Sequence, residues 1–191
     1  MKTKSLIGIG FLMACMVCPA VFAQEEAPKA ELFGGFSIMN FEDADCNYHP
    51  KGKVGGWAAS FAANLNPEFA VKADFSGLYS SGKNPDGTRV EGSRITQYNI
   101  LGGVQYTKRY ENINVFGEAL GGFVKVDEKI TAYHSHAYNG YGMAFGGGVD
   151  WKFNPKIAWR IAQVDYMPAH WNEKFHHNIR YQTGVLLSLG K

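Results

Sequence analysis

Residues 141–151 read Tyr-Gly-Met-Ala-Phe-Gly-Gly-Gly-Val-Asp-Trp, and this stretch decides the fold class. Most of its odd positions carry large apolar side chains, while the even positions carry glycine, alanine and finally an aspartate. A period of two is typical of a β-strand with one apolar face and one small or polar face. The stretch is also about twice as long as the usual strand of a globular protein.

The same alternation recurs in eight runs that we expect to be strands. They are residues 30–40, 53–65, 68–80, 93–107, 112–126, 138–153, 156–167 and 176–190. A tilted strand that crosses a membrane needs about 9–11 residues, and most of these runs exceed that length. Their length and alternation therefore favour membrane strands.

The connections between the runs are of two alternating kinds. Tight turns are expected at Asn66-Pro67-Glu68, 108–111 and Asn154-Pro155, because Pro and Asn favour turn geometry. Longer polar segments lie between them, at 41–52, 81–92, 127–137 and 168–175. Short turns at one rim and long loops at the other are typical of an outer-membrane barrel.

The N-terminus predicts export. Residues 1–23 have a basic start, an uncharged apolar stretch and small residues before Gln24, which is the pattern of a cleaved secretory signal. Residues 24–29 would form a short N-terminal segment and residues 30–191 the barrel domain. Losing Lys2 and Lys4 leaves 17 basic and 17 acidic residues, so a nucleic-acid partner is not expected. Cys46 alone would remain, which excludes an internal disulfide.

Residues 141–150, followed by 156–161 and 163–166, resemble the last strands of small outer-membrane barrel proteins of the OmpA-like or OmpX-like kind. The resemblance implies an all-β fold, an eight-stranded antiparallel up-and-down transmembrane β-barrel with short periplasmic turns and long extracellular loops. It implies location in the outer membrane, with lipids and lipopolysaccharide around the barrel and the barrel assembly machinery as a partner during insertion. OmpA proper continues into a peptidoglycan-binding domain, and this sequence stops at Lys191, so that tethering function is expected to be absent.

Strand parity assigns a set of charged side chains to the barrel interior. They are Glu31, Lys72, Asp74, Glu118, Asp150, Arg160 and Arg180. Side chains fill an eight-stranded interior, and buried charges are tolerated when they are paired. We expect a structural ion-pair plug, with a gated pore as the alternative. A bulge near 161–163 would be needed to turn Arg160, Gln163 and Asp165 inward together.

All six histidines fall in or beside the expected long loops. His134 and His136 would point the same way in an extended segment, and histidine is the commonest neutral metal ligand. A surface metal site would use a set of five: His134, His136, His170, His176 and His177. The alternative is that these are ordinary loop residues, and no cofactor is expected. An enzyme is not expected either. Ser135 between His134 and His136 is the only suggestive grouping for a nucleophile and its base, and the surrounding residues do not match the His-x-Ser-Asn run of the barrel deacylases.

Aromatic residues are expected to form girdles at the two rims. Phe69, Tyr106, Trp151 and Phe153 fall near the short turns, and Tyr79 and Tyr141 nearer the long loops. The predicted function is therefore structural or surface-exposed, with a possible extracellular ligand bound by the loops. One alternative is a narrow porin or small-solute channel. Another is a soluble, lipocalin-like periplasmic carrier, which would need an apolar interior and a polar exterior.

Overall fold

The computed structural model of the protein describes residues 27–41, 52–83, 89–131, 134–171 and 173–190. The expected signal segment, Cys46 and His49 lie outside these residues. The described chain forms eight strands, and none of its parts is a helix long and apolar enough to span a membrane. The strands are β1 (Ala30–Phe41), β2 (Gly52–Asn64), β3 (Phe69–Lys83), β4 (Arg89–Arg109), β5 (Ile113–Thr131), β6 (His134–Asn154), β7 (Ile157–Trp171) and β8 (Lys174–Leu189).

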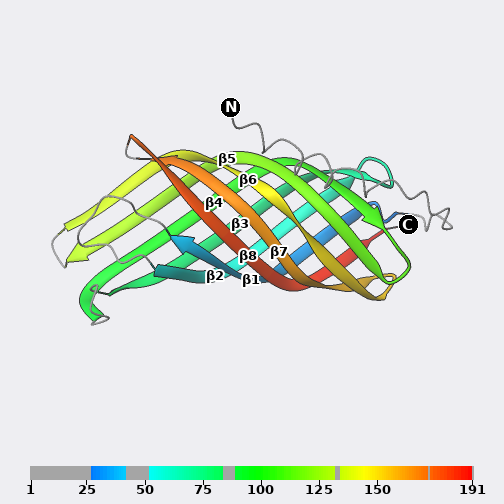
Figure 1. Ribbon diagram of the computed structural model, residues 1–191, viewed down its shortest axis with the longest axis horizontal. Helices are drawn as coiled ribbons and strands as arrows, with labels where there is room; N and C mark the ends of the chain where they lie inside the picture. The colour runs from blue at the N-terminus through cyan, green and yellow to red at the C-terminus, as the bar shows by residue number, and fades with distance from the viewer. Residues whose placement is uncertain (1–26, 42–51, 84–88, 132–133, 172, 191) are drawn as a thin grey trace, which may run out of the picture.

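The eight strands close into one antiparallel barrel. Each strand pairs with the next in sequence, and β8 pairs with β1, from Ala30↔Leu189 to Asn40↔Ile179. Figure 1 shows the strands running obliquely around a single wall, with the C-terminus at one end. Closure satisfies the backbone hydrogen bonds along the wall, as a bilayer requires. The predicted fold class is confirmed.

Two of the three short turns are built in the same way. Asn66 Oδ1 accepts hydrogen bonds from the backbone N–H groups of Glu68 and Phe69, at 2.9 and 2.8 Å. Asn154 Oδ1 accepts from those of Lys156 and Ile157, at 2.8 and 2.9 Å. An asparagine followed by proline thus satisfies the two backbone donors that a tight hairpin leaves free.

The segments 127–137 and 168–175, expected as loops, are largely strand, and in the second of them β7 runs to Trp171 and β8 begins at Lys174. β5 and β6 pair through Asp127↔Ala137 and on to Thr131↔His134, with a register shift between Lys129 and Thr131. Figure 1 shows this hairpin and the β3–β4 hairpin extending furthest at the end opposite the C-terminus. The sequence pattern missed the extension because strands that project into water keep their hydrogen bonds without needing an apolar face.

The outer face of the wall is apolar. Phe123 is 75 % exposed, Ile100 56 % and Phe145 47 %. Several aromatic side chains pair on this face near the rims, including Phe69 with Tyr106 and Trp151 with Phe153, at centroid distances of 5.2 and 5.7 Å. Such a surface fits hydrocarbon flanked by headgroups. A lipocalin-like carrier would carry these side chains inside instead.

Candidate functional site

The barrel interior is the first candidate site, because it holds all seven charged side chains that parity assigned to it. Glu31, Lys72, Asp74, Glu118, Asp150, Arg160 and Arg180 are each 7 % exposed or less. They come from β1, β3, β5, β6, β7 and β8, and strand alternation turns each of them inward.

Six of the seven belong to one hydrogen-bonded network. Lys72 Nζ donates to Glu118 Oε2 at 2.6 Å. Arg160 donates to both carboxylate oxygens of Asp150, at 2.8 and 3.1 Å. Arg180 donates to Asp74 Oδ1 at 2.7 Å and to Asp165 Oδ2 at 2.9 Å. Every cation of the network therefore faces at least one carboxylate.

Gln163 joins these pairs into one network. Its Oε1 accepts from Arg160 Nη1 at 2.8 Å, and its Nε2 donates to Glu118 Oε1 at 2.9 Å and to Asp165 Oδ2 at 2.8 Å. The amide thus links three ion pairs from five strands. A network of this kind resists piecemeal rearrangement, since moving one side chain breaks bonds to several others.

Arg160 is also held by aromatic rings. Its guanidinium carbon lies 4.1 Å from the ring centroid of Phe116 and 4.6 Å from that of Phe33. A side chain at Gly146 would collide with the carbonyl oxygen of Val164 and with the carboxylate of Asp165. The small residues of β6 therefore leave the interior volume that the network fills.

The bulge that inward-facing Arg160, Gln163 and Asp165 require is present. The β7–β8 register shifts between Arg160 and Gln163, and both Ile161 and Ala162 face outward. Asp165 and Gln163 are fully buried as a result. Parity alone could not assign them, because one extra residue reverses the face of every position beyond it.

Glu31 lies apart from the network and pairs with a residue that the sequence analysis did not single out. Arg109 Nη2 donates to Glu31 Oε1 at 2.9 Å, and Arg109 Nη1 donates to the carbonyl oxygen of Pro67. Arg109 shares its parity with the buried Gln105 and Thr107. That signal was available, but the residue fell within the segment assigned to a turn.

Apolar layers lie on either side of the network. Toward the long loops, all strands but β8 contribute to one cluster, which includes Met39, Val54, Leu78, Ile95, Val126, Ala144 and Trp171. Inside the barrel, Trp171 stacks on His176 of β8, with ring centroids 3.7 Å apart and nearly parallel ring planes. A smaller cluster of Phe33, Ala58, Ala158 and Leu186 lies toward the short turns. Buried side chains thus occupy the interior at successive heights.

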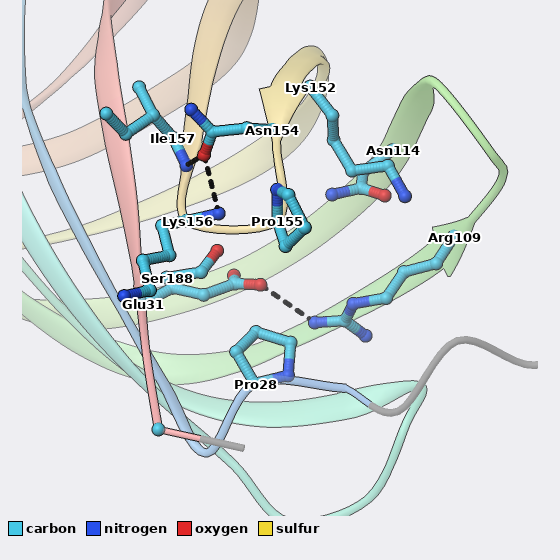
Figure 2. A pocket seen from close by; sticks show the side chains of 11 residues that line it. Pro28, Glu31, Arg109, Asn114, Lys152, Asn154, Pro155, Lys156, Ile157 and Ser188 are labelled. Atoms are coloured by element: carbon cyan, nitrogen blue, oxygen red, sulfur yellow. Dashed lines mark hydrogen bonds and ion pairs between the residues drawn. The ribbon is translucent and has the colours of Figure 1, made fainter.

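A cavity of about 720 Å³, here called the vestibule, opens at the short-turn end. Figure 2 shows Arg109 reaching across it toward Glu31, with Asn114 and Lys152 on the side of β5 and β6. Lys156, in the turn between β6 and β7, also lines it. Three of the lining side chains are cationic and one is anionic.

The structure does not bring the candidate metal ligands together. His176 faces the interior, while His170 and His177 face outward, where they stack on Tyr141 and Tyr166. His136 lies against Tyr138, at 6.1 Å between centroids, and the side chains of His134 and Ser135 are outside the described ones. No group of three metal-binding residues occurs in the part of the chain that is described. A loop metal site stays a prediction.

A closed antiparallel barrel with an apolar outer face and a buried charged interior defines a transmembrane β-barrel protein. The chain belongs to the outer membrane protein beta-barrel domain family, whose model matches residues 9–181. Membership places it among outer-membrane proteins. No curated protein matches the sequence.

Solved structures share the fold at low sequence identity. Neisserial surface protein A is 12 % identical, with a TM-score of 0.61 over 86 % of this chain and all of that one. OprG from Pseudomonas aeruginosa is 13 % identical, with a TM-score of 0.61 over 89 % of this chain and all of that one. Ail of Yersinia pestis is 12 % identical, with a TM-score of 0.56 over 84 % of this chain and 99 % of that one.

Proposed function

We propose that the protein is a non-catalytic structural component of the outer membrane, with a lumen plugged by ion pairs and extracellular hairpins available for contact outside the cell. The observation that supports this proposal is the buried ion-pair network, which links opposite walls of the barrel through hydrogen bonds. Its charged members include Lys72, Glu118, Asp150, Arg160, Asp165 and Arg180. A conducting pore would need these pairs to separate, at the cost of leaving charges buried without partners.

The proposal includes the surroundings that the family implies. Outer-membrane lipids and lipopolysaccharide would cover the apolar outer face, and the assembly machinery would insert the barrel after removal of residues 1–23. These partners fit a wall whose aromatic side chains lie near both rims.

Extracellular contact is proposed for the β5–β6 hairpin. Its pairing extends to Thr131↔His134, whereas β6 begins to pair with β7 only at Tyr141↔His170. The hairpin therefore projects beyond the neighbouring β7–β8 hairpin. Ail of Yersinia pestis, which shares the fold, has been crystallised with the heparin analogue sucrose octasulfate.

Planar-bilayer recording separates this proposal from a narrow porin. We expect the purified, refolded protein to give no steady conductance, because side chains fill an eight-stranded interior. A known porin, inserted from the same detergent, is the positive control. Stable ohmic steps that scale with salt concentration would contradict the plug and favour a channel.

A second experiment separates the barrel's role from that of the hairpin. Cells lacking the protein receive either the full chain or a variant in which Asn-Gly replaces residues 127–137, a pair suited to a tight hairpin turn. We expect both to restore the resistance of the cells to detergent, because the structural role that we propose rests on the barrel. Restoration by the full chain alone would move the function to the hairpin.

A further inference from the structure

The ion-pair network of the lumen does not balance its own charge. Among the described residues it contains four carboxylates and three cations, each 7 % exposed or less. They are Asp74, Glu118, Asp150 and Asp165 against Lys72, Arg160 and Arg180. If all of them were ionised, the four acids and three bases would leave the network with one uncompensated negative charge. Burial of such a charge is strongly unfavourable.

Two of the three cations are matched one to one. Lys72 donates to Glu118 Oε2 at 2.6 Å, and Gln163 Nε2 donates to the other oxygen of the same carboxylate at 2.9 Å. Arg160 donates to both oxygens of Asp150, at 2.8 and 3.1 Å. Every carboxylate oxygen of these two pairs has a donor, so the excess charge lies elsewhere.

The excess charge lies at Arg180, which serves two carboxylates. Its Nη1 donates to Asp74 Oδ1 at 2.7 Å, and its Nη2 and Nε donate to Asp165 Oδ2 at 2.9 and 3.0 Å. The second oxygen of each acid has no hydrogen-bond partner, and these two are the only carboxylate oxygens among the unpartnered buried side-chain atoms of the described residues. Two acids that share one cation titrate as one unit.

The strands beside this unit bring no further cation at the same height. The paired neighbours of its three residues on the adjoining strands are uncharged: Gly146 on β6, Ser60 on β2, Leu101 on β4 and Met39 on β1. The inward-facing His176 of β8 stacks on Trp171, against the apolar layer toward the long loops.

The nearest charged groups do not supply the missing compensation. Lys72 and Arg160 are bound to carboxylates of their own. Glu118 is a third acid close by, because Gln163 Nε2 contacts its carboxylate at 2.9 Å and that of Asp165 at 2.8 Å. A neighbouring negative charge opposes ionisation of both acids around Arg180.

We propose that Asp74 and Asp165, on either side of Arg180, form a proton-binding site that holds one proton while the barrel is folded. One carboxylate oxygen takes up H⁺ from water, and the network becomes neutral. A proton needs no cavity, so the complete burial of both acids is compatible with its binding. The site rests on the proposed ion-pair plug and makes that plug sensitive to pH.

The sign of the pH dependence follows from proton counts. In the unfolded chain both acids are ionised at about pH 7, so the folded barrel binds one proton more. Stability therefore falls as the pH rises, and the equilibrium constant for unfolding increases by up to roughly tenfold per pH unit. The fall ends once the folded barrel has also released the proton.

The protonation state is measured on the folded chain without residues 1–23, in lipid nanodiscs, with aspartate labelled by ¹³C at the side-chain carboxyl. The carbon chemical shift distinguishes a carboxylic acid from a carboxylate. We expect Asp74 and Asp165 to carry one proton between them at about pH 7, and the remaining acid to be ionised when either is replaced by asparagine. Asp127→Asn, at an exposed position outside the lumen, is the control and should leave the signal unchanged.

Stability gives an independent readout, because asparagine resembles a protonated aspartate in size and charge. Asp74→Asn and Asp165→Asn should each leave urea unfolding at about pH 7 nearly unchanged and abolish its shift between about pH 7 and pH 10. The double variant leaves Arg180 without a carboxylate and should be strongly destabilised. Asp150→Asn makes the same change in a one-to-one pair and should destabilise the barrel already at about pH 7.

Four results would overturn the proposal. Asp74 and Asp165 could both prove ionised in the folded barrel at about pH 7, or Asp165→Asn could cost as much stability as Asp150→Asn. The pH dependence could persist in both single variants. A sodium ion in place of the proton would give two ionised acids and stability that rises with sodium concentration. Steady conductance would instead contradict the plug itself, so the two failures are distinguishable.

Discussion

At the scale of single residues, the interior depends on charges that are stable only as pairs. Lys72 and Glu118 are almost fully inaccessible and 2.6 Å apart, and Glu118 is the acid that faces Lys72. Removing one member of a buried pair leaves the other charge without compensation, whereas replacing both with apolar groups is often neutral. The same substitution is therefore expected to destabilise the barrel when its partner is kept and to cost much less when the partner is replaced as well.

We predict that Glu118→Leu lowers the free energy of unfolding by about 3–5 kcal/mol, because Lys72 stays buried and charged. Arg160→Leu, which strips Asp150 of its partner, should cost a similar amount. Urea unfolding followed by tryptophan fluorescence in detergent measures both. The double variant Lys72→Met with Glu118→Leu should recover most of the loss. Single variants as stable as the unmodified protein would contradict a structural role for the network.

At the scale of elements, the two Asn-Pro turns fix where the hairpins reverse. In each turn, the side-chain oxygen of the asparagine accepts hydrogen bonds from two backbone N–H groups. The β2–β3 and β6–β7 registers follow from these turns, and register decides which side chains enter the interior.

We predict that Asn66→Ala and Asn154→Ala each lower stability by about 1 kcal/mol, the usual worth of such hydrogen bonds. Asn139→Ala, at an exposed position of β6, is the matched control and should change little. Thermal unfolding of the three variants in one detergent makes the comparison. A loss at Asn139 equal to that at Asn66 would show that the turn bonds are not responsible.

The elements also show how far sequence alone could go. The apolar alternation predicted all eight strands, because the bilayer imposes it on every residue that faces lipid. It did not predict the extension of β5 and β6 to Thr131 and His134, where no lipid constrains the pattern. The inward orientation of Asp165 and Gln163 could not be predicted because it depends on a bulge. That of Arg109 was missed because β4 ends at this residue, within the segment expected as a turn. Which charges pair across the barrel could not be predicted either. Strand parity tells which face a residue lies on, whereas pairing depends on the register between the strands.

At the scale of the whole molecule, the wall separates two environments with opposite demands. Its outer face is apolar. Its interior consists of apolar layers on either side of a layer of ion pairs. Each layer draws side chains from strands far apart in the sequence, so the barrel must close before any layer is complete. Closure and interior packing are therefore expected to form in one cooperative step.

Layering leads to a prediction about Trp171, the largest side chain of the apolar layer near the long loops. Trp171→Ala should cost about 3–5 kcal/mol of stability, as a large cavity forms beside His176. It should not create conductance, because the ion-pair network beneath stays intact. Bilayer recording and heat-dependent gel mobility test the two halves separately. Stable conductance in Trp171→Ala would show that the apolar layer alone closes the lumen, and that water and ions pass the network once that layer is opened.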